Sequence, residues 1–144
     1  MRKMAVMALI AAGMLCFSPA AWADDQPTGI WRMADGKVTV RISPCGAKLC
    51  ATVVALKKPR DDKGRPRLDK ENPNPALRTR PVLGLTILSG MRPAGNNLWI
   101  GIIYNPDDGN TYSSNMRLQN SGAMRVQGCV AYVLCKSMTF VRVN

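Results

Sequence analysis

The sequence contains no histidine at all. Histidine is the commonest general base at neutral pH and the commonest metal ligand, so its absence removes the usual Ser–His and Cys–His pairs and most zinc sites. The acidic stretch at residues 107–110 lacks the alternating ligands and the distal glutamate of a calcium loop, and a turn explains it better. We therefore expect no catalytic site, no metal, no cofactor and no enzymatic activity.

Long hydrophobic runs are missing after the N-terminus, so no later segment is expected to cross a membrane. Residues 1–3 are basic, residues 4–17 are uniformly small or apolar, and residues 21–23, Ala-Trp-Ala, match the cleavage pattern of signal peptidase. The apolar run is shorter than the ~20 residues that a spanning helix needs. We expect a cleaved signal peptide over residues 1–23, a periplasmic location, and a single domain over residues 24–144.

Aromatic residues are few, at 6 % of the sequence, and they are scarce in its basic stretches. A nucleic-acid site would need such rings to stack on bases, so the net charge of +11 does not point to nucleic acid. Loss of Arg2 and Lys3 with the signal segment would leave a charge of +9. Such a protein is suited to phosphorylated lipid head groups, acidic polysaccharide or an acidic partner, although the charge can also serve solubility alone.

Cysteine is scarce in the expected mature chain, which holds Cys45, Cys50, Cys129 and Cys135 and no Cys-x-x-Cys motif. Redox sites and zinc knuckles usually contain that motif, whereas an even number of cysteines in an exported protein favours disulfides. The members of each pair flank a predicted turn, so they can face each other across a hairpin. We expect bridges 45–50 and 129–135, with crossed pairings as the open alternative.

Hydrophobic alternation with a period of two dominates the rest of the chain, interrupted by turn residues such as those at 35–36 and 106–109. No segment predicts a helix of ordinary length. The predicted fold is all-β, an eight-stranded up-and-down antiparallel barrel, with a β-sandwich as the alternative. A barrel of eight strands is either just filled by its side chains or able to hold one small ligand. The predicted strands are residues 29–33, 38–43, 49–56, 83–87, 98–104, 111–118, 124–130 and 138–143.

The first and last predicted strands carry residues suited to closing one end of the barrel. Gly29 and Trp31 share one face of the first strand, and Arg142 lies on the last. This arrangement resembles the lipocalin signature, in which a Gly-x-Trp motif places an indole across the closed end and an arginine packs over the ring. A guanidinium stacks well on indole, so the pair can cap a hydrophobic core. An ordinary core role for Trp31 is the simpler alternative.

Short blocks of sequence also stand out along the whole chain: residues 29–31, 42–46, 49–50, 69–73, 78–84, 104–112 and 128–129. In this order they resemble a bacterial exported family known as domain of unknown function 2147. The resemblance covers nearly all of the expected mature chain, and it implies a lipocalin-like barrel in the periplasm with no catalytic residues. The C-terminal block departs slightly, since the family often has tryptophan before Thr-Arg where this chain has Phe140-Val141-Arg142.

A basic, proline-rich segment at residues 58–82 separates the third and fourth predicted strands. It is longer than most loops of a compact domain, and its composition fits disorder. Asn74 followed by Pro75 nevertheless predicts an N-cap and a short helical turn, so an ordered lid or side flap is expected. In a lid, Arg78 and Arg80 could hold a carboxylate or phosphate by paired hydrogen bonds.

The candidate ligand-binding residues are Arg67, Arg78 and Arg80, together with Tyr104 and Tyr112 on neighbouring predicted strands. Any one of the arginines could instead pair with a carboxylate such as that of Asp69 and merely fasten the loop. The two tyrosines could equally form an ordinary cross-strand pair.

Two functions fit these features. A hollow barrel with a basic mouth would make the chain a periplasmic binding protein for a small amphipathic or anionic ligand. A filled barrel would make it a non-enzymatic interaction module of the envelope, which docks its basic segment on an anionic surface or partner. The predicted interior side chains are medium to large, so the sequence leaves both functions open.

Overall fold

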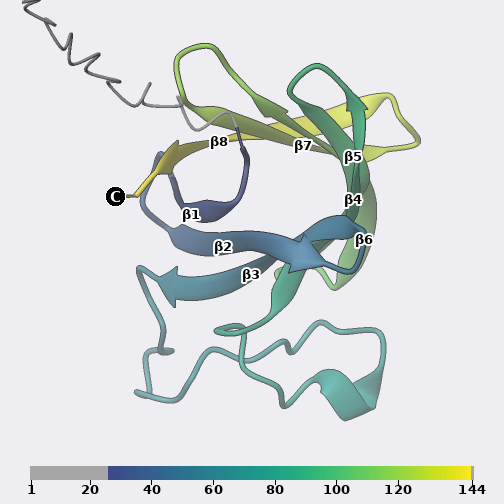
Figure 1. Ribbon diagram of the computed structural model, residues 1–144. Helices are drawn as coiled ribbons and strands as arrows, with labels where there is room; N and C mark the ends of the chain where they lie inside the picture. The colour runs from purple at the N-terminus through teal and green to yellow at the C-terminus, as the bar shows by residue number, and fades with distance from the viewer. Residues whose placement is uncertain (1–25, 144) are drawn as a thin grey trace, which may run out of the picture.

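Eight antiparallel strands close into a barrel in the computed structural model, which describes residues 26–143 (Figure 1). Each strand pairs with its neighbours in sequence, and β1 pairs with β8 to complete the ring. The predicted up-and-down barrel is therefore confirmed, while the predicted signal segment and its cleavage site lie outside the described residues. The strands are β1 (Gly29–Met33), β2 (Val38–Cys45), β3 (Lys48–Leu56), β4 (Thr86–Gly95), β5 (Leu98–Asn105), β6 (Asn110–Leu118), β7 (Met124–Val130) and β8 (Leu134–Arg142).

The alternation of the sequence gives the barrel its apolar interior, because successive residues of a strand point to opposite faces of the sheet. In β2, Val40 and Ile42 are buried, whereas Arg41 between them is exposed. Met124 and Val126 are buried in the same way in β7. The predicted alternation of apolar and polar residues along each strand therefore places the apolar side chains inside the barrel, where they form the core.

The fourth strand differs from its prediction, since β4 spans Thr86–Gly95 rather than residues 83–87. The continuation was missed because Gly90 and Pro93 resemble turn residues. Gly90 has φ +62°, and the pairing of β4 with β5 is irregular around both positions. Bulged pairing of this kind bends a strand without ending it, which alternation alone does not reveal.

Two disulfides cross-link neighbouring strands at their turns, as expected. Cys45 and Cys50 join β2 to β3 with a Cα–Cα distance of 5.8 Å. Cys129 and Cys135 join β7 to β8 with a Cα–Cα distance of 4.0 Å. Because each bridge closes a short loop, each should contribute roughly 2 kcal/mol to stability through chain entropy.

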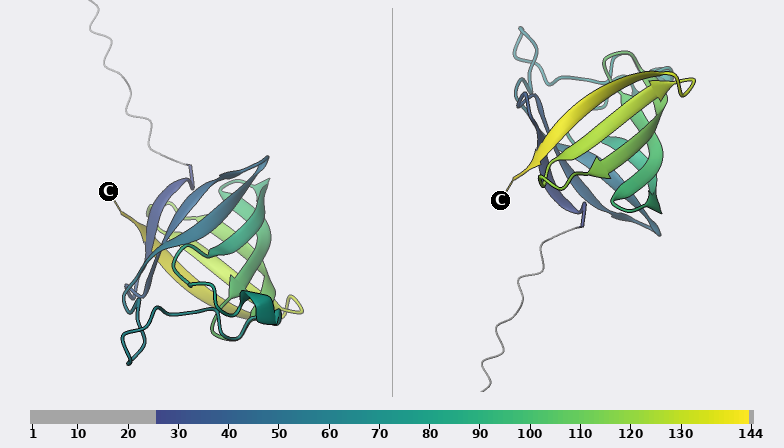
Figure 2. Two further views of the ribbon diagram at one scale, coloured as in Figure 1. Left: turned by 90° about the horizontal axis from the view of Figure 1, so that it is seen from below. Right: turned by 90° about the horizontal axis from the view of Figure 1, so that it is seen from above.

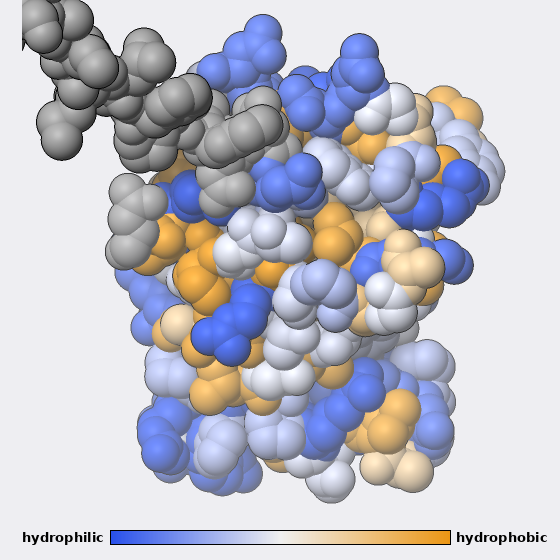
Figure 3. Space-filling view, viewed as in Figure 1, coloured by the Kyte–Doolittle hydropathy of each residue, from blue (hydrophilic) through white to orange (hydrophobic). Residues whose placement is uncertain are grey.

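We call residues 57–85, which connect β3 to β4, the flap. Figure 2 shows the flap at one end of the barrel, and the corresponding lower part of Figure 3 is mainly hydrophilic. The flap contains the short 3₁₀ helix η1 (Pro75–Leu77), and the side chain of Asn74 accepts a hydrogen bond from the Ala76 N–H at 3.1 Å, which confirms the predicted cap. No helix within residues 26–143 is long and apolar enough to cross a membrane.

Candidate ligand-binding site

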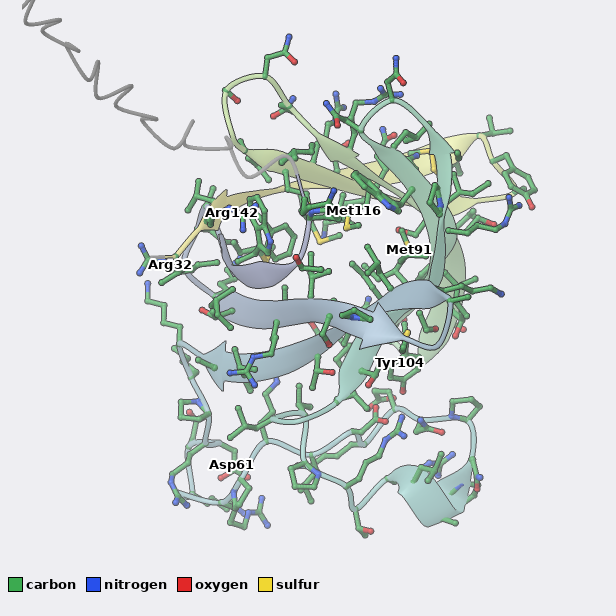
Figure 4. All side chains as sticks on the ribbon, in the orientation of Figure 1. Arg32, Asp61, Met91, Tyr104, Met116 and Arg142 are labelled. Atoms are coloured by element: carbon green, nitrogen blue, oxygen red, sulfur yellow. A yellow bond between two sulfur atoms is a disulfide. The ribbon has the colours of Figure 1, made fainter. Side chains whose placement is uncertain are left out.

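One end of the barrel is closed by a tryptophan and an arginine. Trp31 on β1 is fully buried, and its Nε1–H donates to the Pro27 carbonyl at 2.7 Å. The guanidinium carbon of Arg142, on β8, lies 4.4 Å from the centroid of the Trp31 ring. Arg142 also donates to the backbone carbonyls of Thr28 at 2.8 Å and Gln26 at 2.6 Å (Figure 4). The arginine thus fastens the N-terminal segment over the indole, in the geometry that the sequence motif predicted.

Steric constraints explain why the Gly-x-Trp motif has a glycine at its first position. Gly29 has φ +126°, a conformation that residues with a Cβ rarely adopt. A Cβ at this position would also lie 2.9 Å from Nη1 of Arg142. A residue with a Cβ would be strained at this φ and would also have to displace the guanidinium, so the motif and the closing arginine form one structural unit.

The interior is packed at the closed end and hollow at the other. Trp31, Met91 and Met116 are almost completely buried, and Figure 4 shows the two methionines inside the barrel. The remaining half holds a cavity of about 620 Å³. Its lining is mainly apolar and includes Val38, Val40, Ile42, Val53, Leu56, Ile87, Leu88, Ile103, Val126, Met138 and Phe140. The filled barrel that the sequence left open is therefore not the arrangement found here.

Charged side chains gather at the mouth of this cavity. Lys37, Arg67 and Lys136 line it together with Asp107 and Asp108. Sequence reasoning missed the two lysines. Lys37 directly precedes β2 and Lys136 is the third residue of β8, so both lie near turns at the rim of the barrel, and that position was the signal available.

The flap forms one side of the mouth and does not cover it. Two residues of the flap line the cavity, Arg67 and Val82. Arg67 pairs with Asp107 in the β5–β6 turn, and the Val82 N–H donates to the Arg67 carbonyl at 2.9 Å. A Cβ on Gly109 would overlap the backbone of Glu71, so the flap packs directly on this turn. The expected ordered segment is accordingly a side flap rather than a lid.

A buried carboxylate anchors the flap to the barrel. The side chain of Asp69 has no exposed surface. It accepts hydrogen bonds from Tyr104 Oη at 2.6 Å, from Arg80 Nε at 2.8 Å and from Asn72 Nδ2 at 2.9 Å. Burial by itself would raise the pKa of Asp69, but the hydrogen bonds from Tyr104, Asn72 and Arg80 outweigh burial and lower it.

The two arginines predicted to hold a ligand have structural roles instead. Arg80 is bound to Asp69, and its guanidinium carbon lies 5.8 Å from the centroid of the Tyr104 ring. Arg78 Nε donates to the Asn72 carbonyl at 2.7 Å. Neither Arg78 nor Arg80 lines the cavity, so both fasten the flap, which was the alternative interpretation.

Tyr104 and Tyr112 do line the cavity, as the sequence suggested. The hydroxyl of Tyr112 donates to Asp108 at 2.6 Å, as that of Tyr104 does to Asp69. The pKa of Tyr104 is raised by burial and by Asp69, and that of Tyr112 by its hydrogen bond to Asp108 and by burial. Both hydroxyls therefore donate hydrogen bonds to carboxylates. A ligand in the cavity would contact the aromatic rings of the two tyrosines rather than their hydroxyls.

Replacing Asp69 with asparagine should lower the free energy of unfolding at neutral pH by about 2 kcal/mol, because a neutral amide cannot accept all three hydrogen bonds. Because the pKa of Asp69 is lowered in the folded protein, its carboxylate stabilises the fold at pH values above the ordinary aspartate pKa of about 3.9. This stabilisation is lost as the pH falls through the pKa of Asp69 in the folded protein. Urea unfolding at a series of pH values should show this acid-induced loss in the wild type and a flatter profile in Asp69→Asn. Asp62→Asn, at an exposed aspartate of the same flap that forms no ion pair with the described residues, is the matched control and should change little. Equal effects at the two positions would contradict the anchoring role.

Comparison with known proteins agrees with this architecture. Residues 29–142 match a family described as "Uncharacterized protein conserved in bacteria (DUF2147)". A solved structure from Helicobacter pylori, described as a protein of the lipocalin family, is similar with a TM-score of 0.70 and 25 % identity over 83 % of this chain and 84 % of that one. No curated protein matches the sequence. Since the family match spans almost the whole barrel, the chain belongs to the DUF2147 family, with a lipocalin-like fold.

Proposed function

We propose that this protein is a non-enzymatic binding protein of the periplasm, which holds a small amphipathic anion in its barrel. The observation that carries this proposal is the cavity of about 620 Å³, which has mainly apolar walls and an opening where Lys37, Arg67 and Lys136 lie beside Asp107 and Asp108. Cavities of ~300–1,000 Å³ with mainly apolar linings are typical of sites for small organic ligands. The similarity to a lipocalin-family structure supports the same reading, since that fold can hold ligands inside the barrel.

The charges at the mouth indicate where the head of the ligand would lie. Lys37 has a partner in Asp35 at 3.1 Å, and Arg67 has one in Asp107. Lys136, in contrast, has no ion pair within residues 26–143. An anionic head group beside Lys136 would gain a partner without displacing an existing one, while the apolar body of the ligand occupied the interior.

The periplasmic location rests on the signal-like N-terminal sequence and agrees with the two disulfides of the barrel. Binding without covalent chemistry fits the lack of histidine and the engagement of both cavity tyrosines with carboxylates.

A fluorescence titration with dansyl-labelled undecanoic acid tests the proposed ligand class. The wild type should bind the acid, and Lys136→Gln should weaken binding about fivefold, or ~1 kcal/mol, because one exposed charge is lost from the rim. The methyl ester of the probe should bind the wild type and Lys136→Gln equally. Lys48→Gln, with the same charge change at the β2–β3 turn, is the control and should behave as wild type. A wild-type protein that binds neither the acid nor the ester would refute the proposal.

A further inference from the structure

The turn between β7 and β8 exposes an apolar cluster. We call residues 130–134, Val-Ala-Tyr-Val-Leu, the apolar tip. Tyr132 is 84 % exposed, Val133 81 % and Leu134 73 %, which makes them the most exposed large hydrophobic residues that the structure describes. No charged residue interrupts the apolar tip, so it is a concentrated apolar surface rather than a scattered one.

The backbone of the apolar tip is unusual for its sequence. Ala131 and Tyr132 have φ values of +49° and +62°, and the Val133 N–H donates to the Val130 carbonyl at 3.1 Å. Hairpin turns with two positive φ values normally carry Asn-Gly or similar pairs, because a Cβ is unfavourable there. Cys129 and Cys135 tie the base of the turn together. An exposed tyrosine at a strained backbone position is unusual, and strain of this kind often marks a functional site.

The apolar tip stands at the mouth of the cavity. Val130, Leu134 and Lys136 all line the opening. Figure 2 shows the β7–β8 turn and the flap at the same end of the barrel, and hydrophobic surface is visible at the upper right edge of Figure 3, where this turn projects. The apolar and the basic parts of the protein therefore face the same way.

The surroundings of the apolar tip are strongly basic. The flap carries nine Lys or Arg residues and four Asp or Glu residues. Lys37 and the exposed Lys57 are adjacent, since the Lys57 N–H donates to the Lys37 carbonyl at 2.9 Å, and Lys136 follows the tip itself. The opposing charges at the rim are those of Asp35, Asp107 and Asp108. The balance at this end of the barrel remains positive.

We propose that the mouth end of the barrel docks on an anionic phospholipid bilayer, with Tyr132 and Val133 inserted at the level of the head groups. A projecting turn of five residues is too small for a stable protein interface, which buries ~800 Å² on each partner. A few apolar side chains beside basic residues are sufficient for binding to an anionic membrane surface. Tyrosine is well suited to that boundary, because its ring is apolar and its hydroxyl is polar.

Docking goes beyond the proposed function, because it requires no ligand in the cavity. Where both hold, the opening of the cavity faces the lipid, and an amphipathic ligand could pass between the membrane and the barrel with little exposure to water.

Sedimentation with vesicles tests docking directly. The wild type should bind vesicles of phosphatidylcholine and phosphatidylglycerol, bind pure phosphatidylcholine at least tenfold more weakly, and lose affinity as salt is raised. The double variant Tyr132→Ser/Val133→Ser should bind the anionic vesicles at least tenfold more weakly than the wild type. The matched control Val141→Ser, which removes another exposed apolar side chain of β8 near Trp31, should bind as the wild type does.

Two further measurements keep the test decisive. The double variant should retain the wild-type thermal transition and the wild-type affinity for the dansylated acid in solution, so that a failure of docking is separable from a failure of ligand binding. Absence of wild-type binding to anionic vesicles would overturn the proposal, as would unchanged binding by the double variant. A concentration-dependent dimer that the double variant abolishes would assign the apolar tip to a second copy of this chain and would also overturn it.

Discussion

Replacing Met138 with tryptophan is expected to weaken binding of the dansylated acid at least tenfold. Met138 lines the cavity from β8 and is half-buried, so its side chain borders the space that the ligand would occupy. An indole is larger and more rigid than the methionine side chain, and inside a closed barrel it has no direction in which to relax except the cavity. Titration of the variant with the fluorescent acid measures the effect.

The neighbouring residue provides a matched control. Thr139 lies on the same strand but points to the outer face, where it is exposed. Thr139→Trp introduces the same side chain outside the barrel and should leave the affinity unchanged. Equal binding by Met138→Trp and the wild type would place the ligand outside the cavity, and equal weakening by both variants would show that the strand rather than the cavity is responsible.

Trp31→Ala is expected to cause the largest loss of stability, about 3–5 kcal/mol in the free energy of unfolding. The substitution empties a fully buried site at the closed end and leaves the Pro27 carbonyl without its donor. It also removes the ring on which the Arg142 guanidinium rests. Urea unfolding monitored by circular dichroism measures the change.

The second tryptophan of the described barrel is the comparison. Trp99 on β5 is only partly buried and packs against the core. Trp99→Ala should therefore cost clearly less than Trp31→Ala. If the two losses were equal, or if Trp31→Ala cost under ~1 kcal/mol, the closing role assigned to Trp31 and Arg142 would be wrong.

Features that depend on neighbouring residues were predictable from the sequence. Apart from most of β4, the strands follow from local alternation, and each disulfide joins residues on either side of one turn. The pair formed by Trp31 and Arg142 joins distant residues, and it was recognisable only through its resemblance to the lipocalin signature.

Other features that depend on distant residues were not predictable. Asp69 and Tyr104 are 35 positions apart, and nothing in either local sequence indicates their hydrogen bond. The hollow half of the barrel was equally hidden, since Val38, Ile87 and Met138 are residue types that would also suit a filled core. The tight turn at Ala131-Tyr132 is a local feature, but it was not predicted because neither residue is typical of a hairpin turn.

Native mass spectrometry shows directly whether the barrel carries a small amphipathic anion. The oxidised protein would be released gently from a periplasm, weighed by native mass spectrometry, and then denatured so that any released compound could be extracted and identified. We predict a stoichiometric adduct with an apolar body and an anionic head, present in Thr139→Trp and absent from Met138→Trp. A bare polypeptide mass for the wild type, together with no binding of the dansylated acid, would show that the barrel does not carry such a ligand.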